Sequence, residues 1–418
     1  MNGHEAIAVT GIGIVTSLGQ GAATNWTAMR EGRSGAAPVT RFPTEGLATR
    51  FAATVDAICD PALRPTERTA DLARLASDEA LAQAGHEPGA PFPGKLIVGI
   101  PPIQMEWSDR IALDHRTGRR AADYADLIRQ LPDAQPDPIF DHLRFDGTTR
   151  HLAARVQPIG RPVTITTACS SGATAIQIGV EAIRRGEVDR ALAVGADASV
   201  SPEMLMRFGL LSALSRRNDS PETASRPFDK TRDGFVPGEG AGALVLERAD
   251  LARARGATIL GYVRGVGERL DAYHRIRQRP DAGPVGAAMA AAIADAGLAP
   301  GDIDYVNAHG TSTGENDRVE SLGIQNVFGP RAADLPVSSL KSMTGHMLSA
   351  AGVVEAASSL LMIAEQTLLP TINYTTSDPD IPLDVVPNVA RPARVTHVLS
   401  NAFGFGGQNV CLVLSGEP

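Results

Sequence analysis

The stretch Val-Thr-Ile-Thr-Thr-Ala-Cys-Ser-Ser-Gly-Ala-Thr-Ala-Ile, at residues 163–176, changes midway from β-branched side chains to small ones. Its first part predicts a strand at Val163–Thr166, and the small and apolar residues after it predict a helix over Ser171–Arg185. Another apolar run predicts a strand at Ala191–Val194, so the stretch opens a strand–helix–strand unit. Cys169 then lies at the carboxyl end of a strand, and in an open α/β sheet this is the edge where ligands bind.

The same alternation returns later in the chain. The predicted elements there are the helix Pro284–Ala296, the strands Ile303–Asn307 and Val337–Leu340, and the helix Ser349–Ile363. Residues 228–242 are rich in turn formers and predict an ordered connection, and Gly242–Leu246 predicts the strand that closes the first half. We therefore expect an internally duplicated α/β protein, with one half at residues 1–255 and the other at residues 256–418.

Three segments depart from this alternation. Ile7–Val9 predicts a short strand leading into a tight turn at residues 10–16, where the Gly-x-Gly spacing lacks the third glycine of a dinucleotide site, so we expect no nicotinamide binding. Charges, aromatics and prolines from Ile103 to Ala154 predict a cap insertion over the sheet, within residues 100–160, that forms a lid or a partner surface. Two buried strands, joined by a glycine-rich bend, are predicted at Val395–Ser400 and Val410–Leu414.

The composition limits the function. The chain has 418 residues, 43% of them apolar and only 4% aromatic, so small side chains must fill the interior of a layered α/β protein. A formal net charge of −8 argues against a nucleic-acid-binding protein, and no apolar run reaches membrane-spanning length without a glycine or a charge. Three widely spaced cysteines fit a reducing compartment and Met1–Ala6 shows no export signal, so we expect a cytoplasmic protein.

Four side chains combine into a candidate site for thiolate chemistry. Cys169 precedes Ser-Ser-Gly and an apolar helix, whose positive end and unpaired N–H groups are expected to lower the pKa of the thiol. His309 and His346 lie among small residues that leave room for a ligand, and two neutral imidazoles can stabilise one oxyanion. Lys341 ends an apolar strand five residues before His346, so we expect it to lie buried near the imidazoles and to shape the site electrostatically.

Other residues of these types receive plainer interpretations. Cys59 and Cys411 are expected to be inert core residues. Seven histidines are expected to be structural or surface groups: His4, His86, His115, His142, His151, His274 and His397. Phe405, between glycines, either packs in the core or faces the site. Thr311 and Thr313 either satisfy turn hydrogen bonds or hold the polar part of a long thioester arm.

Five motifs occur in one order along the chain. They are Thr-Ala-Cys-Ser-Ser-Gly at 167–172, Arg-Pro-Phe-Asp-Lys-x-Arg-Asp-Gly-Phe-Val-x-Gly-Glu-Gly-Ala-Gly at 226–242, Asn-Ala-His-Gly-Thr-Ser-Thr at 307–313, Lys-Ser-Met-Thr-Gly-His at 341–346, and Asn-Ala-Phe-Gly-Phe-Gly-Gly-Gln-Asn at 401–409. With them the chain resembles the elongating β-ketoacyl-acyl-carrier-protein synthases, of the synthase II type, over essentially its whole length. The resemblance implies a thiolase-like fold: two related βαβαβ halves in five layers, α-β-α-β-α, usually as a homodimer.

The resemblance also implies a reaction. Cys169 accepts an acyl group from acyl carrier protein, and His309 and His346 hold the thioester carbonyl of malonyl-carrier while carbon dioxide leaves. The resulting carbanion attacks the acyl-Cys169 carbonyl, which gives a 3-oxoacyl-carrier two carbons longer. The backbone N–H groups of Cys169 and Phe405 are implied as the oxyanion hole, and Phe405 is also implied as a gate.

Supporting roles follow from the same resemblance. Thr311 and Thr313 are implied to contact the phosphopantetheine arm of the carrier, and Lys341 and Glu355 to support the site. In some relatives a monovalent cation lies near the counterparts of four residues: Asn307, Glu355, Ser400 and Asn401. No other cofactor is implied. Carrier proteins are acidic, so a basic docking patch is expected, with candidates Arg64, Arg68, Arg74, Arg207, Arg216 and Arg217.

The chain departs from the family pattern in one place that affects specificity. Relatives commonly carry Gly-Ser-Gly-Ile-Gly-Gly where this chain has the bulkier Gly99–Trp107, so chain-length preference does not carry over. One alternative function is the ketosynthase subunit of a type II polyketide or polyene pathway, which can need a cysteine-less partner in a heterodimer. A non-catalytic chain-length subunit is disfavoured by the intact Cys169, and a Cys-His hydrolase by the presence of two histidines and a lysine.

Overall fold

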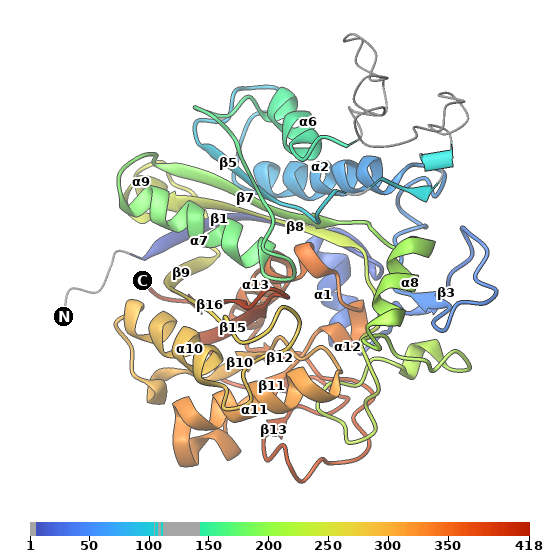
Figure 1. Cartoon of the computed structure of the whole chain (residues 1–418). Helices are drawn as coiled ribbons and strands as arrows, with labels where there is room; N and C mark the ends of the chain where they lie inside the picture. The colour runs from blue at the N-terminus through green and yellow to red at the C-terminus, as the bar shows by residue number, and fades with distance from the viewer. Residues whose placement is uncertain (1–5, 104, 108–109, 112–142) are drawn as a thin grey trace.

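The computed structural model describes residues 6–103, 105–107, 110–111 and 143–418 (Figure 1). Strands of the first half are hydrogen-bonded in the order β6-β5-β7-β8-β1. Their bounds are β1 Ile7–Thr16, β5 Lys95–Gly99, β6 Val163–Ile165, β7 Arg190–Asp197 and β8 Gly240–Arg248. β5, β6 and β7 are parallel, whereas β8 runs antiparallel to both β7 and β1.

The second half repeats this arrangement. Its strands follow the order β11-β10-β15-β16-β9, with β13 added at the edge. Their bounds are β9 Gly261–Leu270, β10 Tyr305–Asn307, β11 Pro336–Ser338, β13 Asp384–Val385, β15 His397–Phe403 and β16 Gln408–Ser415. With the shared strands numbered in chain order, each sheet reads third, second, fourth, fifth, first. The two sheets join where Ile7–Val9 of β1 pairs with residues 261–263 of β9.

Helices cover both sheets and fill the space between them (Figure 1). On the outer side of the first sheet, α2 (Pro65–Gln83) packs on the strands, with α6 (Gly147–Val156) against it. α7 (Ser171–Arg184) and α13 (Ala351–Glu365) lie in the middle and contact strands of both sheets. α10 (Gly283–Asp295) covers the second sheet, with α11 (Gly314–Phe328) beside it. The layers alternate α-β-α-β-α, which is the expected thiolase-like fold.

The other elements are short. They are β2 Gly19–Gln20, α1 Ala22–Arg30, β3 Ala37–Pro38, β4 Phe51–Ala52, α8 Pro202–Leu210, η1 Pro221–Thr223, α9 Ala249–Ala254, η2 Pro300–Asp302, η3 Gly329–Ala333, α12 Lys341–Thr344, η4 Leu348–Ala350, β12 Thr367–Leu368 and β14 Arg391–Pro392. α9 and β9 lie on either side of residue 255. Much of the expected cap insertion, residues 112–142, lies outside the described residues.

The start of the chain differs from the expectation. Residues 7–16 form one strand with a bulge between Val9 and Gly11, and the predicted tight turn is wrong. A Cβ on Gly13 would come within 1.9 Å of the carbonyl oxygen of Ala76 in α2, and Gly11 meets the same helix equally closely. These glycines therefore allow α2 to pack directly on the strand, a role that local sequence does not distinguish from a turn.

One helical segment of the described chain has the length and apolarity of a membrane span. This segment, Leu348–Glu365, comprises η4 and α13, and 78% of it is buried inside the protein. Because it lies between the two sheets and contacts both, we interpret it as a core helix.

Candidate active site

One cavity collects the reactive side chains of both halves. Cys169 follows β6, His309 follows β10, and Lys341 and His346 follow β11, so all four lie beyond the carboxyl ends of parallel strands. Cys169, His309, His346 and Phe405 line a single cavity of about 280 Å³. Lys341 is buried and does not line it.

A strained turn presents Cys169. The preceding residue, Ala168, has a φ of 50°, in the left-handed region that is unfavourable for alanine. Its carbonyl oxygen accepts hydrogen bonds from the N–H and the hydroxyl of Ser171, at 3.2 and 2.6 Å. Helix α7 begins at Ser171, which places Cys169 at the positive end of a buried helix. The backbone N–H groups of Phe405 and of Cys169 itself lower the pKa of the thiol.

Burial decides the protonation of the thiol. Cys169 is 7% exposed, and burial raises its pKa to about 11. The positive charge of Lys341 and the two backbone N–H groups lower the pKa by less than burial raises it, while Asp197 acts in the same direction as burial. The expectation of a lowered pKa is therefore wrong. The resting thiol is protonated, so its proton has to leave during the chemistry.

The two histidine rings contact each other in the cavity. Their centroids are 5.3 Å apart and their planes meet at 84°. Burial lowers the pKa of His309 and of His346 well below the usual value, and the charge of Lys341 lowers both further, so the rings are neutral at neutral pH. The main chain holds both residues: the N–H of His309 donates to the carboxylate of Glu320 at 2.8 Å, and the N–H of His346 to the carbonyl of Val236 at 2.7 Å.

Lys341 and Glu355 form a buried ion pair near these rings. The Nζ of Lys341 donates to Oε1 of Glu355, and each side chain is only 1% exposed. Burial raises the pKa of Glu355 to about 7, against the opposing effect of the lysine charge. The second carboxylate oxygen, Oε2, has no hydrogen-bond partner among the described residues.

Thr311 and Thr313 also line the cavity. Their hydroxyl oxygens are 2.9 Å apart, and the Thr313 hydroxyl caps α11 by accepting the N–H of Asn316. Turn hydrogen bonds thus account for part of their polarity.

The glycine-rich bend places Phe405 at the cavity. Phe405 is 40% exposed, and its ring centroid lies 6.3 Å from that of Phe208. A Cβ on Gly404 would come within 2.5 Å of the carbonyl oxygen of Thr167, so the bend passes directly against the turn that carries the nucleophile. Only glycine permits this approach, and the approach brings the N–H of Phe405 to the cysteine sulfur.

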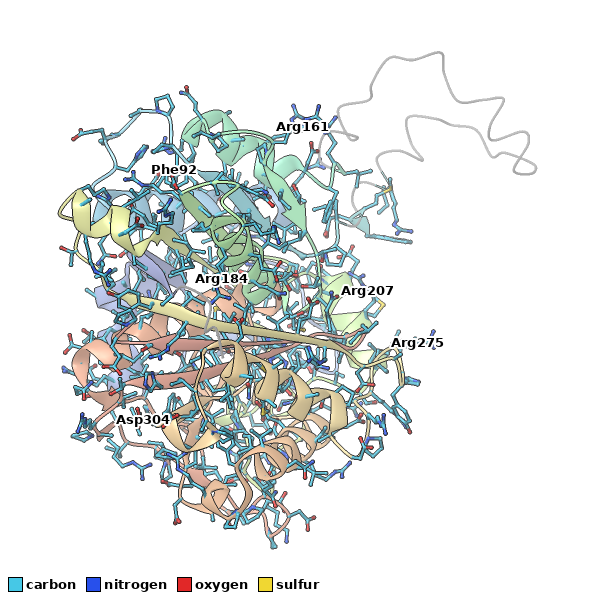
Figure 2. The ribbon with its side chains drawn as sticks, turned by 90° about the vertical axis from the view of Figure 1, so that its left-hand side faces the viewer. Phe92, Arg161, Arg184, Arg207, Arg275 and Asp304 are labelled. Atoms are coloured by element: carbon cyan, nitrogen blue, oxygen red, sulfur yellow. The ribbon has the colours of Figure 1, made fainter. Side chains whose placement is uncertain are left out.

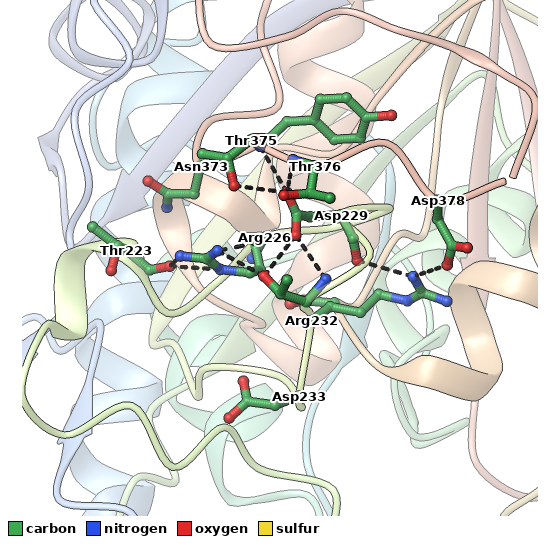
Figure 3. A network of polar contacts seen from close by, with 12 residues as sticks. Thr223, Arg226, Asp229, Arg232, Asp233, Asn373, Thr375, Thr376 and Asp378 are labelled. Carbon is green, nitrogen blue, oxygen red and sulfur yellow. Dashed lines mark hydrogen bonds and ion pairs between the residues drawn. The ribbon is translucent and has the colours of Figure 1, made fainter.

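A polar network anchors the motif at residues 226–242 to the second half (Figure 3). The carboxylate of Asp229 accepts the N–H groups of Thr375 and Thr376 at 2.6 and 2.7 Å, and Arg232 pairs with Asp378 at 2.7 Å. Although burial raises the pKa of Asp229, the hydrogen bonds that it accepts lower it to about 2. The sequence alone predicted only an ordered connection here.

The same motif braces His346. The N–H of Gly238 donates to the His346 carbonyl at 2.9 Å, and the ring centroids of Phe235 and His346 are 5.4 Å apart. Several cavity-lining residues received no role in the sequence, among them Phe208 on α8 and Phe235. His274 is exposed, as expected for a surface group, and it also lines the cavity. Its neighbours Tyr273 and Arg275 are exposed rather than small, so no local pattern marked its place there.

Three of the four residues expected near a monovalent cation offer buried oxygen ligands. Buried Oδ1 of Asn307, Oε2 of Glu355 and Oδ1 of Asn401 have no hydrogen-bond partner among the described residues. Asn307 pairs with Ser400 between β10 and β15, and its amide donates to the Glu355 carbonyl at 3.0 Å. Such oxygens fit a hard cation. Within the described part of the chain, no cluster of His, Cys, Asp and Glu could hold a metal ion.

The six arginines expected to dock a carrier do not form one patch. Arg68 is 3% exposed and pairs with buried Glu239 at 3.8 Å, while Arg74 pairs with Asp71 at 2.5 Å. Arg207 lies on α8, beside the cavity-lining Phe208 (Figure 2). The grouping was wrong because α2 turns Arg68 toward the core, which neighbouring positions in the sequence did not reveal.

Comparison with known proteins identifies the family. Residues 4–252 match the β-ketoacyl synthase N-terminal domain, and residues 260–375 match the C-terminal domain. The chain is 38% identical to 3-oxoacyl-[acyl-carrier-protein] synthase 2 of Coxiella burnetii, with 98% of each chain covered. It is 37% identical to the putative polyketide β-ketoacyl synthase 1 of Streptomyces cyaneus, again with 98% of each covered. The chain belongs to the β-ketoacyl synthase family, whose members are condensing acyltransferases.

Solved structures agree with this assignment. The ishigamide ketosynthase/chain length factor superposes with a TM-score of 0.83 at 34% identity, covering 99% of this chain and 100% of that one. A structure of a type II polyketide acyl-carrier protein in complex with its ketosynthase, bound to the hexaketide, gives a TM-score of 0.85 at 29% identity with the same coverage. The duplicated, five-layered architecture is therefore shared with ketosynthases.

Proposed function

We propose that this protein joins an acyl group to a malonyl unit, both carried on acyl carrier protein, in a decarboxylative Claisen condensation. Cys169 attacks the acyl thioester, and the carrier leaves as its thiol after taking up the cysteine proton. The N–H groups of Cys169 and Phe405 stabilise the oxyanion that forms at the carbonyl. The acyl-Cys169 thioester divides a condensation between two carriers into two steps that use one cavity.

In the second step the malonyl thioester enters the same cavity. The neutral imidazoles of His309 and His346 donate hydrogen bonds to its carbonyl oxygen, where negative charge develops as carbon dioxide leaves. The enolate carbon then attacks the carbonyl of acyl-Cys169, the carbon–sulfur bond breaks, and the released thiolate regains a proton. Lys341 supports this step because its charge lowers the pKa of both imidazoles. Thr311 and Thr313 contact the phosphopantetheine arm.

One observation carries this proposal. A buried cysteine at the start of helix α7 shares a cavity with two neutral imidazoles whose centroids are 5.3 Å apart. With acyl-carrier and malonyl-carrier, the purified protein should release carbon dioxide and form 3-oxoacyl-carrier. Cys169→Ala should abolish acyl transfer, whereas the matched Cys59→Ala should retain it. Absence of product with short, medium and long acyl donors contradicts the proposal, and acyl thioester hydrolysis without a malonyl partner favours a Cys-His hydrolase.

Two pathways use this chemistry. Fatty-acid elongation is the first, and in it we expect a homodimer. The second is a type II polyketide pathway, favoured by the similarity to the Streptomyces cyaneus protein and to the ishigamide ketosynthase/chain length factor. In that case we expect a heterodimer with a related, cysteine-less subunit. Native mass spectrometry of the complex purified from its own host separates the two, because a homodimer has twice the mass of this chain and a heterodimer does not.

We further propose that a monovalent cation binds the oxygens of Asn307, Glu355, Ser400 and Asn401. Bound there, it supplies a fixed positive charge beside the Glu355 carboxylate. Thermal unfolding in potassium, sodium and tetramethylammonium chloride at equal ionic strength tests this. A higher Tm in potassium or sodium than in the bulky cation supports the site, and equal Tm values in all three salts contradict it.

A further inference from the structure

The main chain of His346 is paired with the motif at residues 226–242. The N–H of His346 donates to the carbonyl of Val236 at 2.7 Å, and the His346 carbonyl accepts the N–H of Gly238 at 2.9 Å. The imidazole has no comparable anchor, because its Nδ1 has no hydrogen-bond partner among the described residues. The orientation of the ring therefore depends on this main-chain pairing and on the edge-on packing of the Phe235 ring.

Residues 236–239 are also paired with a segment from the start of the chain. The N–H of Ala53 donates to the carbonyl of Pro237 at 2.8 Å, and the N–H of Glu239 donates to the carbonyl of Ala53 at 2.9 Å. Residues 236–239 thus lie between this early segment and His346, with hydrogen bonds to both. A displacement of residues 236–239 would therefore be passed on to the main chain of His346.

Glu239 ends this segment and is held in a buried cluster of charges. Its side chain is fully buried, and the guanidinium of Arg41 donates to both carboxylate oxygens, at 2.5 and 2.8 Å. The same two oxygens accept the N–H groups of Val55 at 3.3 Å and of Val200 at 3.2 Å, and Arg68 lies 3.8 Å away. A bidentate pair of this kind fixes the orientation of the carboxylate as well as its position.

We propose that Arg41 and Glu239 are positioning residues for His346, and that the decarboxylation step depends on them. The proposal rests on the proposed function, in which His346 donates a hydrogen bond to the malonyl carbonyl. Neither side chain lines the cavity, so both act through the main chain of His346. The turn that carries Cys169 is fixed by hydrogen bonds within residues 167–171 instead, so its acylation does not need the pair.

Glu239→Gln tests the proposal, because it keeps the shape of the side chain and removes the charge that Arg41 binds. We expect the loss of carbon dioxide from malonyl-carrier to slow about tenfold or more, since a small misplacement of a catalytic group has a large effect on rate. The rate at which acyl-carrier acylates Cys169 should be unchanged. Arg41→Met should slow the same step, and Arg41→Lys, which keeps the charge but not the bidentate contact, should slow it less.

Glu247→Gln is the matched control. Glu247 lies at the opposite end of β8 from Glu239, its side chain is equally buried, and it pairs with Arg190 at 2.7 Å and with Arg255 at 2.8 Å. The same substitution therefore removes a buried ionic contact of the same kind without touching the residues that hold His346. Both variants should lower the Tm, and only Glu239→Gln should slow decarboxylation.

The placement of His346 can also be measured without turnover. In protein that contains isotope-labelled histidine, the NMR signal of His346 is the one that is missing from His346→Gln. This signal should move in Glu239→Gln and stay in place in Glu247→Gln. The measurement separates the proposal from the proposed function, because absence of decarboxylation in the wild type contradicts the proposed function while the signal still tests the placement.

Three outcomes overturn the proposal. The signal of His346 does not move in Glu239→Gln, or acylation of Cys169 slows as much as decarboxylation, or Glu247→Gln slows decarboxylation as much as Glu239→Gln does. If Glu239→Gln does not fold, the milder Arg41→Lys is put through the same measurements, and the same three outcomes decide.

Discussion

Replacing Lys341 by methionine tests the electrostatic reasoning about the site. The substitution keeps an unbranched side chain, shorter by one atom, and removes the only charge that pairs with Glu355 among the described residues. Both side chains are 1% exposed, so the carboxylate is left buried without a counter-ion. Breaking such a pair costs about 3–5 kcal/mol of unfolding free energy. An exposed pair contributes about 0–1 kcal/mol.

The unfolding free energy that is lost in Lys341→Met should be larger at high pH than at low pH. Burial already raises the pKa of Glu355 to about 7 against the opposing charge of Lys341, so removal of the lysine raises that pKa further. The folded variant then prefers a protonated Glu355, whereas the unfolded chain ionises near pH 4.5. Stability from this preference is present at low pH and is lost as pH rises. Lys341→Met should therefore be less destabilising at pH 6 than at pH 8.

The reacting groups should respond as well. Lys341 lowers the pKa of Cys169, His309 and His346, so all three pKa values rise without it. Alkylation of Cys169 by iodoacetamide, which reacts with the thiolate, should require a higher pH in the variant. The acidic limb of the condensation rate should also move to higher pH, because the imidazoles then protonate more readily.

Urea denaturation and alkylation kinetics across pH measure these effects. Lys95→Met is the matched control, because Lys95 pairs with Glu187 at 3.0 Å on the surface. The double variant Lys341→Met/Glu355→Gln should recover most of the lost stability, since it leaves no buried charge unpaired. A loss below about 1 kcal/mol for Lys341→Met, no recovery in the double variant, or an alkylation profile that moves to lower pH would refute the reasoning.

Three further changes test other parts of the structure. Gly13→Ala should lower the unfolding free energy, measured by urea denaturation, by about 3 kcal/mol or more, because its Cβ would lie 1.9 Å from a carbonyl oxygen of α2. A loss of unfolding free energy below about 1 kcal/mol contradicts the close packing. Gly404→Ala should lower kcat/KM at least tenfold, on the order of 1.4 kcal/mol, because the added Cβ pushes the bend away from Thr167. Gly209→Ala is the control, because its Cβ meets nothing within 4 Å, and it should leave kcat/KM unchanged. Equal rates for the two variants refute the role of Gly404. Burial raises the pKa of Asp197 from 3.8 to about 6, so the stability that this group gives the wild type is lost as pH rises through 6. The unfolding free energy of Asp197→Asn should therefore rise by about 1.4 kcal/mol relative to that of the wild type between pH 5 and pH 7.5. A difference in unfolding free energy that stays constant over this pH range contradicts the reasoning.

The elements that carry the chemistry were predictable because their patterns are local. The helix expected at Ser171–Arg185 is α7, Ser171–Arg184, and the strand expected to end at Asn307 is β10. In each case a β-branched or apolar run gives way to small residues within a few positions. Strand and helix preferences act over that distance, so the end of the strand and the residue that follows it can be located without knowledge of the fold.

Other features required contacts between distant segments. The glycines of β1 were interpreted as a turn, although α2 packs against them from more than sixty residues away. His274 is exposed as expected, and only the fold places it in the cavity wall, on a loop that is hydrogen-bonded to the glycine-rich bend. Arg68 was assigned to a docking patch, although it faces buried Glu239. Nothing adjacent in the sequence distinguishes these alternatives.

The sequence by itself determined the chemical groups, their order and the strand ends that present them, because each depends on neighbouring residues. Only the tertiary structure decided how these groups are protonated and what surrounds them. Burial raises the pKa of Cys169 and lowers the pKa of His309 and His346. Packing also pairs Lys341 with Glu355 and brings Phe208 and Phe405 together at the cavity. Desolvation and charge–charge interactions depend on distances in space, and the folded chain sets those distances by joining segments far apart in sequence.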